Sequence, residues 1–121
     1  MDLKTACPDK LMDAQTAISH IKNGSRVFIG TGCGEPQHLI RTMVEDLSMQ
    51  DIMVYQMLSW TFSDYVDDPR FLRRFSLKLF FISSSMRKAA FEGKIDYIPT
   101  YLSQIPRYFA IEPYLIFITP F

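Results

Sequence analysis

The segment Arg26-Val27-Phe28-Ile29-Gly30-Thr31-Gly32-Cys33-Gly34-Glu35-Pro36 decides the fold class. It begins with a short apolar run of β-branched and aromatic residues, which predicts a buried strand. The glycines then break the strand, and Pro36 fits the first turn of a following helix. The apolar stripe of that helix is formed by Leu39, Ile40, Met43, Val44 and Leu47. A strand, a glycine turn and a helix in this order indicate an α/β protein.

Strands and helices continue to alternate on both sides of this segment. Helical spacing over residues 13–22 predicts a helix with Asp13 as its N-cap and Gly24 as a left-handed closing residue. Downstream, we expect an irregular segment at 58–69, strands at 51–57, 77–83, 95–99 and 114–120, and helical turns at 83–93 and 103–110. Because the strands are apolar throughout, they predict an open, mostly parallel sheet with helices on both faces.

Composition excludes several classes of function. Of the 121 residues, 48% are hydrophobic, which is enough for a core and excludes wholesale disorder. Thirteen basic residues balance thirteen acidic ones, which argues against nucleic-acid binding and against a polybasic membrane surface. Cys7 and Cys33 match no metal-ligand spacing and no disulfide framework, so no metal site is expected. With no signal peptide, the chain is predicted to be a single cytoplasmic domain over residues 1–121.

The C-terminal stretch, Tyr114 to Phe121, is the most apolar part of the chain and is too short to span a bilayer as a helix. The strand expected there continues to the end of the chain with no polar segment after it. We therefore expect the domain to be truncated, that is, to be part of a longer protein; the alternative is a native domain that ends on its last strand. A truncated sheet would expose an edge and an apolar patch, so we also expect a homo-oligomer.

Ligands of open α/β sheets bind where the strands end, and three segments of this chain follow such ends. The first is the glycine turn, where free N–H groups and a helix dipole favour an anion or a developing oxyanion. It matches neither a dinucleotide fingerprint nor a Walker motif, and a purely structural tight turn is an equally open interpretation. The second segment is 56–60, and the third is 83–87. In the third, Arg87 follows three serines that could bind an anion but more often form an N-cap and a solvated turn.

No complete nucleophile arrangement is present in the sequence. Cys33 lies near a helix N-terminus, which favours thiol reactivity, but no motif pairs His38 with an orienting carboxylate. A cysteine–histidine enzyme is therefore not expected. Glu35 is interpreted as an isolated, solvated acid, the most common situation for a lone glutamate.

Two long segments resemble acetyl-CoA hydrolase/transferase proteins, and 4-hydroxybutyrate CoA-transferases in particular. Residues 17–46, AISHIKNGSRVFIGTGCGEPQHLIRTMVED, are similar to the helix, strand, "GEP" glycine turn and leucine-rich helix with which members of this family begin. Residues 74–109, RFSLKLFFISSSMRKAAFEGKIDYIPTYLSQIPRYF, resemble a more specific family segment. The residues at family spacing there are Arg87, Ala89, Gly93, Asp96, Tyr97, Ile98, Pro99, Leu102, Ser103, Ile105 and Pro106.

The resemblance implies a CoA-transferase-like N-terminal domain. Enzymes of this family move CoA between carboxylic acids, with a glutamate nucleophile that passes through acyl-anhydride and glutamyl-CoA thioester intermediates. That glutamate belongs to the second half of the protein, so no catalytic residue is assigned here. The resemblance also implies that coenzyme A takes part as a thioester substrate, with no covalently bound cofactor. The first half is expected to line the acyl and carboxylate pocket, and our candidates are Gly32, Cys33, Gly34, Glu35, Met57, Leu58 and Ser59.

Some features stay open at this point. After the second strand, residues 58–65 contain no glycine, unlike the family pattern, so the geometry of that loop is unassigned. The expected partners are an acyl-CoA and a short carboxylic acid, bound together with the C-terminal half, but the acyl group and the choice between transferase and hydrolase are not specified. One alternative is a non-catalytic module of the same fold that binds CoA or a small acid, or acts in interactions. Another is an unrelated α/β protein whose glycine turn binds a phosphorylated metabolite.

Overall fold

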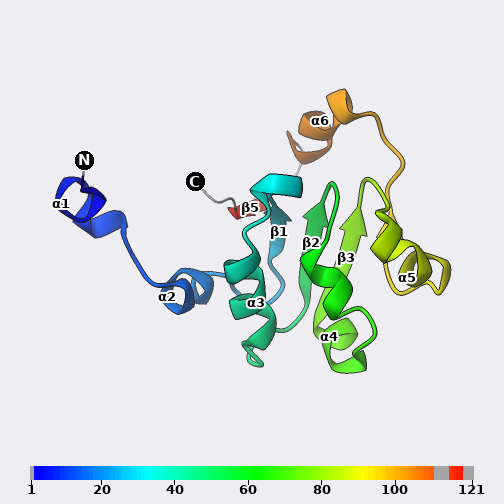
Figure 1. Cartoon of the computed structure of the whole chain (residues 1–121), viewed down its shortest axis with the longest axis horizontal. Helices are drawn as coiled ribbons and strands as arrows, with labels where there is room; N and C mark the ends of the chain where they lie inside the picture. Colours follow the sequence, from blue (N-terminus) through cyan, green and yellow to red (C-terminus); the bar gives the residue numbers. More distant parts are fainter. Residues whose placement is uncertain (1, 111–114, 119–121) are drawn as a thin grey trace.

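A computed structural model describes residues 2–110 and 115–118, in which five parallel strands form one sheet (Figure 1). The strand order is β4-β3-β2-β1-β5. The strands are β1 Arg26–Ile29, β2 Ile52–Gln56, β3 Phe75–Leu79, β4 Asp96–Tyr97 and β5 Leu115–Ile118. In register, Val27 of β1 pairs with Val54 on one side and Ile116 on the other. The predicted parallel α/β architecture is confirmed; Tyr114, Thr119 and Pro120 of the expected last strand lie outside the described residues.

Short helices connect the strands. The α-helices are α1 Leu3–Ala6, α2 Ala14–Ser19, α3 Gln37–Glu45, α4 Pro69–Arg74, α5 Arg87–Phe91 and α6 Ile105–Ala110. Single 3-10 turns are η1 Pro8–Lys10, η2 Gly32–Gly34, η3 Thr61–Asp64, η4 Ser84–Met86 and η5 Leu102–Gln104. The α1 helix lies away from the sheet and contributes no buried residue (Figure 1). Over residues 2–110 and 115–118, no helix has the length and apolar character that a membrane span requires.

The main core lies on one face of the sheet, beneath α2, α3, α4 and α5. Alternate strand positions such as Val27, Val54 and Leu77 point to this face and are almost fully buried. The helices contribute Ile18, Ile40, Met43, Phe71 and Ala89 to the same cluster. Each fully buried aliphatic or aromatic side chain of this kind contributes about 1.5–3 kcal/mol, so this face supplies most of the stability that holds the strand ends in place.

The second face of the sheet is covered by a smaller, aromatic cluster beneath α6. Phe109 of α6 packs edge-on against Phe28 and Tyr55, with ring centroids 5.2 and 5.3 Å apart. Toward the beginning of the strands, Arg26 and Ser76 on this face are exposed. Side chains on this face are therefore less buried than the apolar composition of the strands predicts. The reason is that one short helix, α6, covers only the carboxyl-terminal part of this face.

Two local details differ from the sequence expectations. The segment expected to be irregular runs into α4, where the Asp68 carboxylate accepts a hydrogen bond from the Arg70 amide at 2.8 Å and Pro69 occupies the first helical position. Asp68 and Pro69, the last two residues of the segment expected to be irregular, therefore begin a helix. Leu47, expected in the apolar stripe of α3, is 73% exposed because the helix ends at Glu45.

A surface ion-pair cluster at the end of α5 predicts a pH dependence. The Lys94 ammonium donates hydrogen bonds to Asp67 and Glu92, and these bonds lower the pKa of both carboxyl groups. Because the folded-state pKa values are depressed, the stability that they contribute is present above their ordinary values and is lost as the pH falls through the folded values. Replacing Lys94 with Met should raise both pKa values toward normal in a carboxyl-carbon NMR titration.

The matched control is Lys88→Met, because Lys88 lies farther from Glu92, at 3.8 Å, and forms no ion pair with Asp67 within the described part of the chain. The charge of Lys88 is the smallest of the causes that lower the pKa of Asp67, so this control should raise that pKa much less than Lys94→Met does. A pKa of Asp67 that stays depressed in Lys94→Met would contradict the assignment.

Candidate functional site

Two positions of the glycine turn after β1 favour glycine, one because a backbone atom lies very close and one because of its left-handed φ. A Cβ atom on Gly30 would lie 2.5 Å from the Gly34 carbonyl oxygen, and Gly32 has a φ of +58°, in the left-handed region. Between them the chain makes the 3-10 turn η2, in which the Gly34 amide donates to the Thr31 carbonyl at 3.0 Å. The amides of Gly32 and Cys33 donate to no described residue, so the turn presents two free N–H groups.

The loop after β2, residues 57–61, lies directly beside the glycine turn. The Thr31 hydroxyl donates to the Leu58 carbonyl at 2.6 Å and accepts from the Leu58 amide at 2.8 Å. One side chain thus bridges both backbone groups of a residue in the neighbouring loop. This contact brings the glycine turn and the Met57–Ser59 segment together, as the rule for carboxyl ends of parallel strands predicts.

Glu35 fixes the same loop at a second point. Its side chain is 8% exposed, and its Oε1 accepts hydrogen bonds from the Gln56 amide at 2.9 Å and from the Trp60 backbone N–H at 3.2 Å. Its Oε2 accepts from the backbone N–H and the hydroxyl of Thr61, at 3.2 and 2.9 Å. The expectation of a solvated acid is therefore wrong. Since protein donors occupy both oxygens, this carboxylate positions the loop after β2 against the glycine turn.

The end of β3 joins this arrangement through Ser83. Its hydroxyl donates to the Ser59 carbonyl at 3.0 Å and does not cap the helix that follows. Inside the site, two polar atoms with less than 1 Å² exposed, Gln56 Oε1 and Ser59 Oγ, have no hydrogen-bond partner among the described residues. Unpartnered buried polar atoms are uncommon in proteins, and they mark the space between the loops as polar.

The seven candidate residues occupy two adjoining segments with different exposure. Cys33 is exposed, Glu35 and Ser59 are buried, and the others are partly buried: Gly32, Gly34, Met57 and Leu58. Met57 points to the opposite face of the sheet and packs in the aromatic cluster under α6. Within the residues that the structure describes, no three His, Cys, Asp or Glu side chains are grouped closely enough to hold a metal ion.

Three residues that connect the loops, Thr31, Gln56 and Thr61, are not among the seven candidates, although Thr31 and Gln56 lie in segments that the sequence singled out. Gln56 also donates to the Gly30 carbonyl at 3.0 Å, so it contacts both sides of the glycine turn. A polar residue at the end of an otherwise apolar strand, as in Ile52–Gln56, was the available signal for this role. Thr31 and Thr61 carried no such signal, because threonine is common in turns and strands alike.

This geometry places the chain among open, parallel α/β domains, the class that binds ligands at the carboxyl ends of its strands. A family model described as the acetyl-CoA hydrolase/transferase N-terminal domain matches residues 1–116. The chain belongs to this family.

Two curated relatives are CoA transferases. The 4-hydroxybutyrate coenzyme A transferase of Clostridium kluyveri is 26% identical over 110 residues, which cover 90% of this chain and 25% of that protein. The succinyl-CoA:acetate/propanoyl-CoA:succinate CoA transferase of Fasciola hepatica is 32% identical over 105 residues, covering 84% of this chain and 21% of that protein. This chain therefore spans about a quarter or less of the length of these relatives.

Solved structures of RipA share the fold. The crystal structure of RipA from Yersinia pestis has a TM-score of 0.78 and 22% sequence identity, and the match covers 98% of this chain and 30% of that one. A mutant form of RipA has a TM-score of 0.82 at the same identity and coverage. At this level of identity the likeness establishes the fold.

Proposed function

We propose that this chain is the N-terminal domain of a CoA-transferase or acyl-CoA hydrolase and that it forms one wall of the acyl and carboxylate pocket. The wall consists of the glycine turn at Gly32–Glu35 and the loop at Met57–Ser59, to which Met57 contributes only its backbone because its side chain packs under α6. The nucleophilic glutamate lies in another part of the full-length protein. The substrates are a coenzyme A thioester and a short carboxylic acid, and the chain alone has no transferase activity.

The observation that carries this proposal is the pair of amides at Gly32 and Cys33, which donate to no described residue and lie beside the loop after β2. An acyl group that is attacked develops negative charge on its carbonyl oxygen, and fixed N–H donors stabilise that charge without reorganising. The N–H groups of Gly32 and Cys33 lie between Thr31 and Glu35 in the chain. Both of these residues are hydrogen-bonded to the loop after β2, and these bonds hold the turn in position. The relatives' activities as CoA transferases point to the same chemistry.

An NMR titration tests whether this wall binds a carboxylate. Acetate, succinate and 4-hydroxybutyrate are added separately to the 15N-labelled chain, and we expect saturable shifts of the Gly32 and Cys33 amides. Gly32→Val should abolish them, because a β-branched residue is strongly disfavoured at this positive φ. Gly93→Val is the matched control, since Gly93 also has a positive φ and no atom within 4 Å of an added Cβ. Shifts confined to other regions would refute the proposed pocket.

The claim that the chain is inactive by itself is tested with an assay of CoA transfer. The chain is supplied with 4-hydroxybutyryl-CoA or acetyl-CoA and an acceptor acid, and CoA transfer is followed by chromatography. We expect no transfer above the rate without protein. Turnover by the isolated chain would show that the reacting group lies within these 121 residues.

A further inference from the structure

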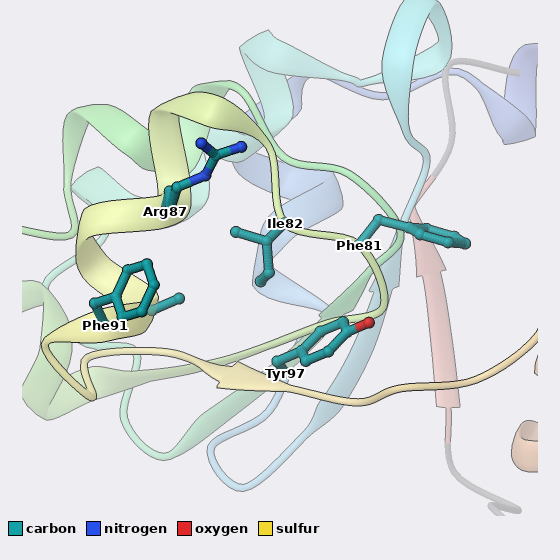
Figure 2. A pocket seen from close by; sticks show the side chains of 6 residues that line it. Phe81, Ile82, Arg87, Phe91 and Tyr97 are labelled. Carbon is teal, nitrogen blue, oxygen red and sulfur yellow. The ribbon is translucent and has the colours of Figure 1, made fainter.

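A hollow next to the end of β3, separate from the glycine turn, has the chemistry of a second binding site. It has a volume of about 780 Å³ and is lined by Phe81, Ile82, Arg87, Ala90, Phe91 and Tyr97. It lies between the end of β3, the helix α5 and the edge strand β4, and it shares no residue with the wall proposed above (Figure 2). A volume of this size lies within the range of small-molecule sites in proteins.

The lining exposes aromatic surface to an unusual degree. Phe91 is 88% exposed and Tyr97 is 54% exposed, and they reach the hollow from α5 and β4 respectively (Figure 2). Ile82 lies between Arg87 and Tyr97 in this view, whereas the ring of Phe81 points away from the other side chains. Neighbouring exposed aromatic rings on a small domain indicate a surface that binds a partner or a ligand. Rings of this kind stack on flat, aromatic groups.

The only charge in the lining is positive. Arg87 is exposed, and its guanidinium forms no hydrogen bond or ion pair within the part of the chain that the structure describes. The acids closest to it in sequence already have partners, because Glu92 contacts Lys88 and Lys94, and Asp96 pairs with Lys78 at 2.7 Å. An unpaired guanidinium beside exposed rings is therefore available to an anion, and phosphate is a group that arginine binds well.

We propose that this hollow binds a ligand that joins a flat aromatic ring to a phosphate, as a nucleoside monophosphate does. The ring stacks on Phe91 and Tyr97, and the phosphate is held by Arg87. The inference does not depend on the function proposed for the glycine turn. The same chemistry is available from a free nucleotide and from the nucleotide end of coenzyme A.

Calorimetric titration with AMP tests this site. We expect saturable binding with a Kd of about 0.1–1 mM, as befits a shallow site that holds one ring and one charge. Arg87→Gln and Phe91→Ser should each weaken AMP binding by about tenfold, through loss of the phosphate contact and of the stacking contact. Adenosine should bind about tenfold more weakly than AMP for the same reason, and ribose 5-phosphate should bind more weakly still.

Lys88→Gln is the matched control, because it removes one positive charge from the same short helix at a residue outside the hollow. AMP binding should be unchanged in this variant, and far-UV circular dichroism should show the same fold for all variants. Competition by CoA would place the nucleotide end of CoA in the hollow, and a lack of competition would leave a free nucleotide as the ligand; both results support the site. Absence of saturable AMP binding, or binding that neither Arg87→Gln nor Phe91→Ser weakens, would overturn it.

Discussion

Replacing Glu35 with Ala should lower the free energy of unfolding by about 3–5 kcal/mol, the range expected when one partner of a buried, charge-assisted hydrogen-bond network is removed. The loss has a specific origin. The side-chain amide of Gln56, the backbone N–H of Trp60, and the N–H and hydroxyl of Thr61 would all lose an acceptor in the interior. Urea denaturation followed by circular dichroism measures this change. Small domains have total stabilities of about 5–15 kcal/mol. If the wild-type chain lies near the lower end of this range, the variant should be close to unfolded even without denaturant.

A second substitution separates the hydrogen bonds from the volume of the side chain. Glu35→Gln keeps the shape of the side chain and one acceptor oxygen. Its NH₂ group, however, would face N–H and O–H donors, with which it cannot form hydrogen bonds as an acceptor. We expect a loss of about 1–2 kcal/mol for this variant, clearly smaller than that of Glu35→Ala. Equal losses in the two variants would mean that the carboxylate network is not the source of the stabilisation. A loss below 1 kcal/mol in Glu35→Ala would contradict the buried network itself.

Gly30→Ala should be the next most damaging change, with a loss of about 3 kcal/mol, near the upper end of what overpacking usually costs. The added Cβ would lie 2.5 Å from the Gly34 carbonyl oxygen, a backbone atom that cannot rotate away. The turn would have to open, which would also disturb the Gly30 amide that donates to Ile118 at 2.9 Å. Urea denaturation again provides the measurement.

Gly32→Ala is the informative comparison for this prediction. An added Cβ at Gly32 meets no atom within 4 Å, so its cost comes only from the left-handed backbone, about 1–2 kcal/mol. Gly30→Ala should therefore be the more destabilising of the two, although both lie in the same turn. The reverse order would show that the close approach of Gly30 to Gly34 does not constrain the turn.

The main features of the fold could be predicted because they depend on local pattern. The apolar run before the glycine turn, the stripe in α3 and the alternation of strands with helices together define a parallel α/β sheet. The beginning of α4 was missed because Asp68 and Pro69 suit a turn as well as a helix start, and only the packing of Phe71 against the core selects the helix. The unequal cover of the two faces could not be predicted, because it depends on where the short helix α6 docks.

The candidate site was predictable in position but not in its internal contacts. The rule for strand ends correctly brings the glycine turn and the loop after β2 together. The role of Glu35 could not be inferred, because its partners Gln56, Trp60 and Thr61 lie 21 to 26 residues away and no motif links them. A long-range polar network leaves no periodic trace in a sequence.

The loop held by Glu35 contains an optical probe. Trp60 is the single tryptophan of the chain and is 49% exposed, while its backbone N–H is tied to the Glu35 carboxylate. Fluorescence excited at the red edge of protein absorbance therefore arises from one position next to the proposed pocket wall. Release of this loop should shift the emission maximum to longer wavelength before the sheet itself melts, so the wall can be followed in real time without a label.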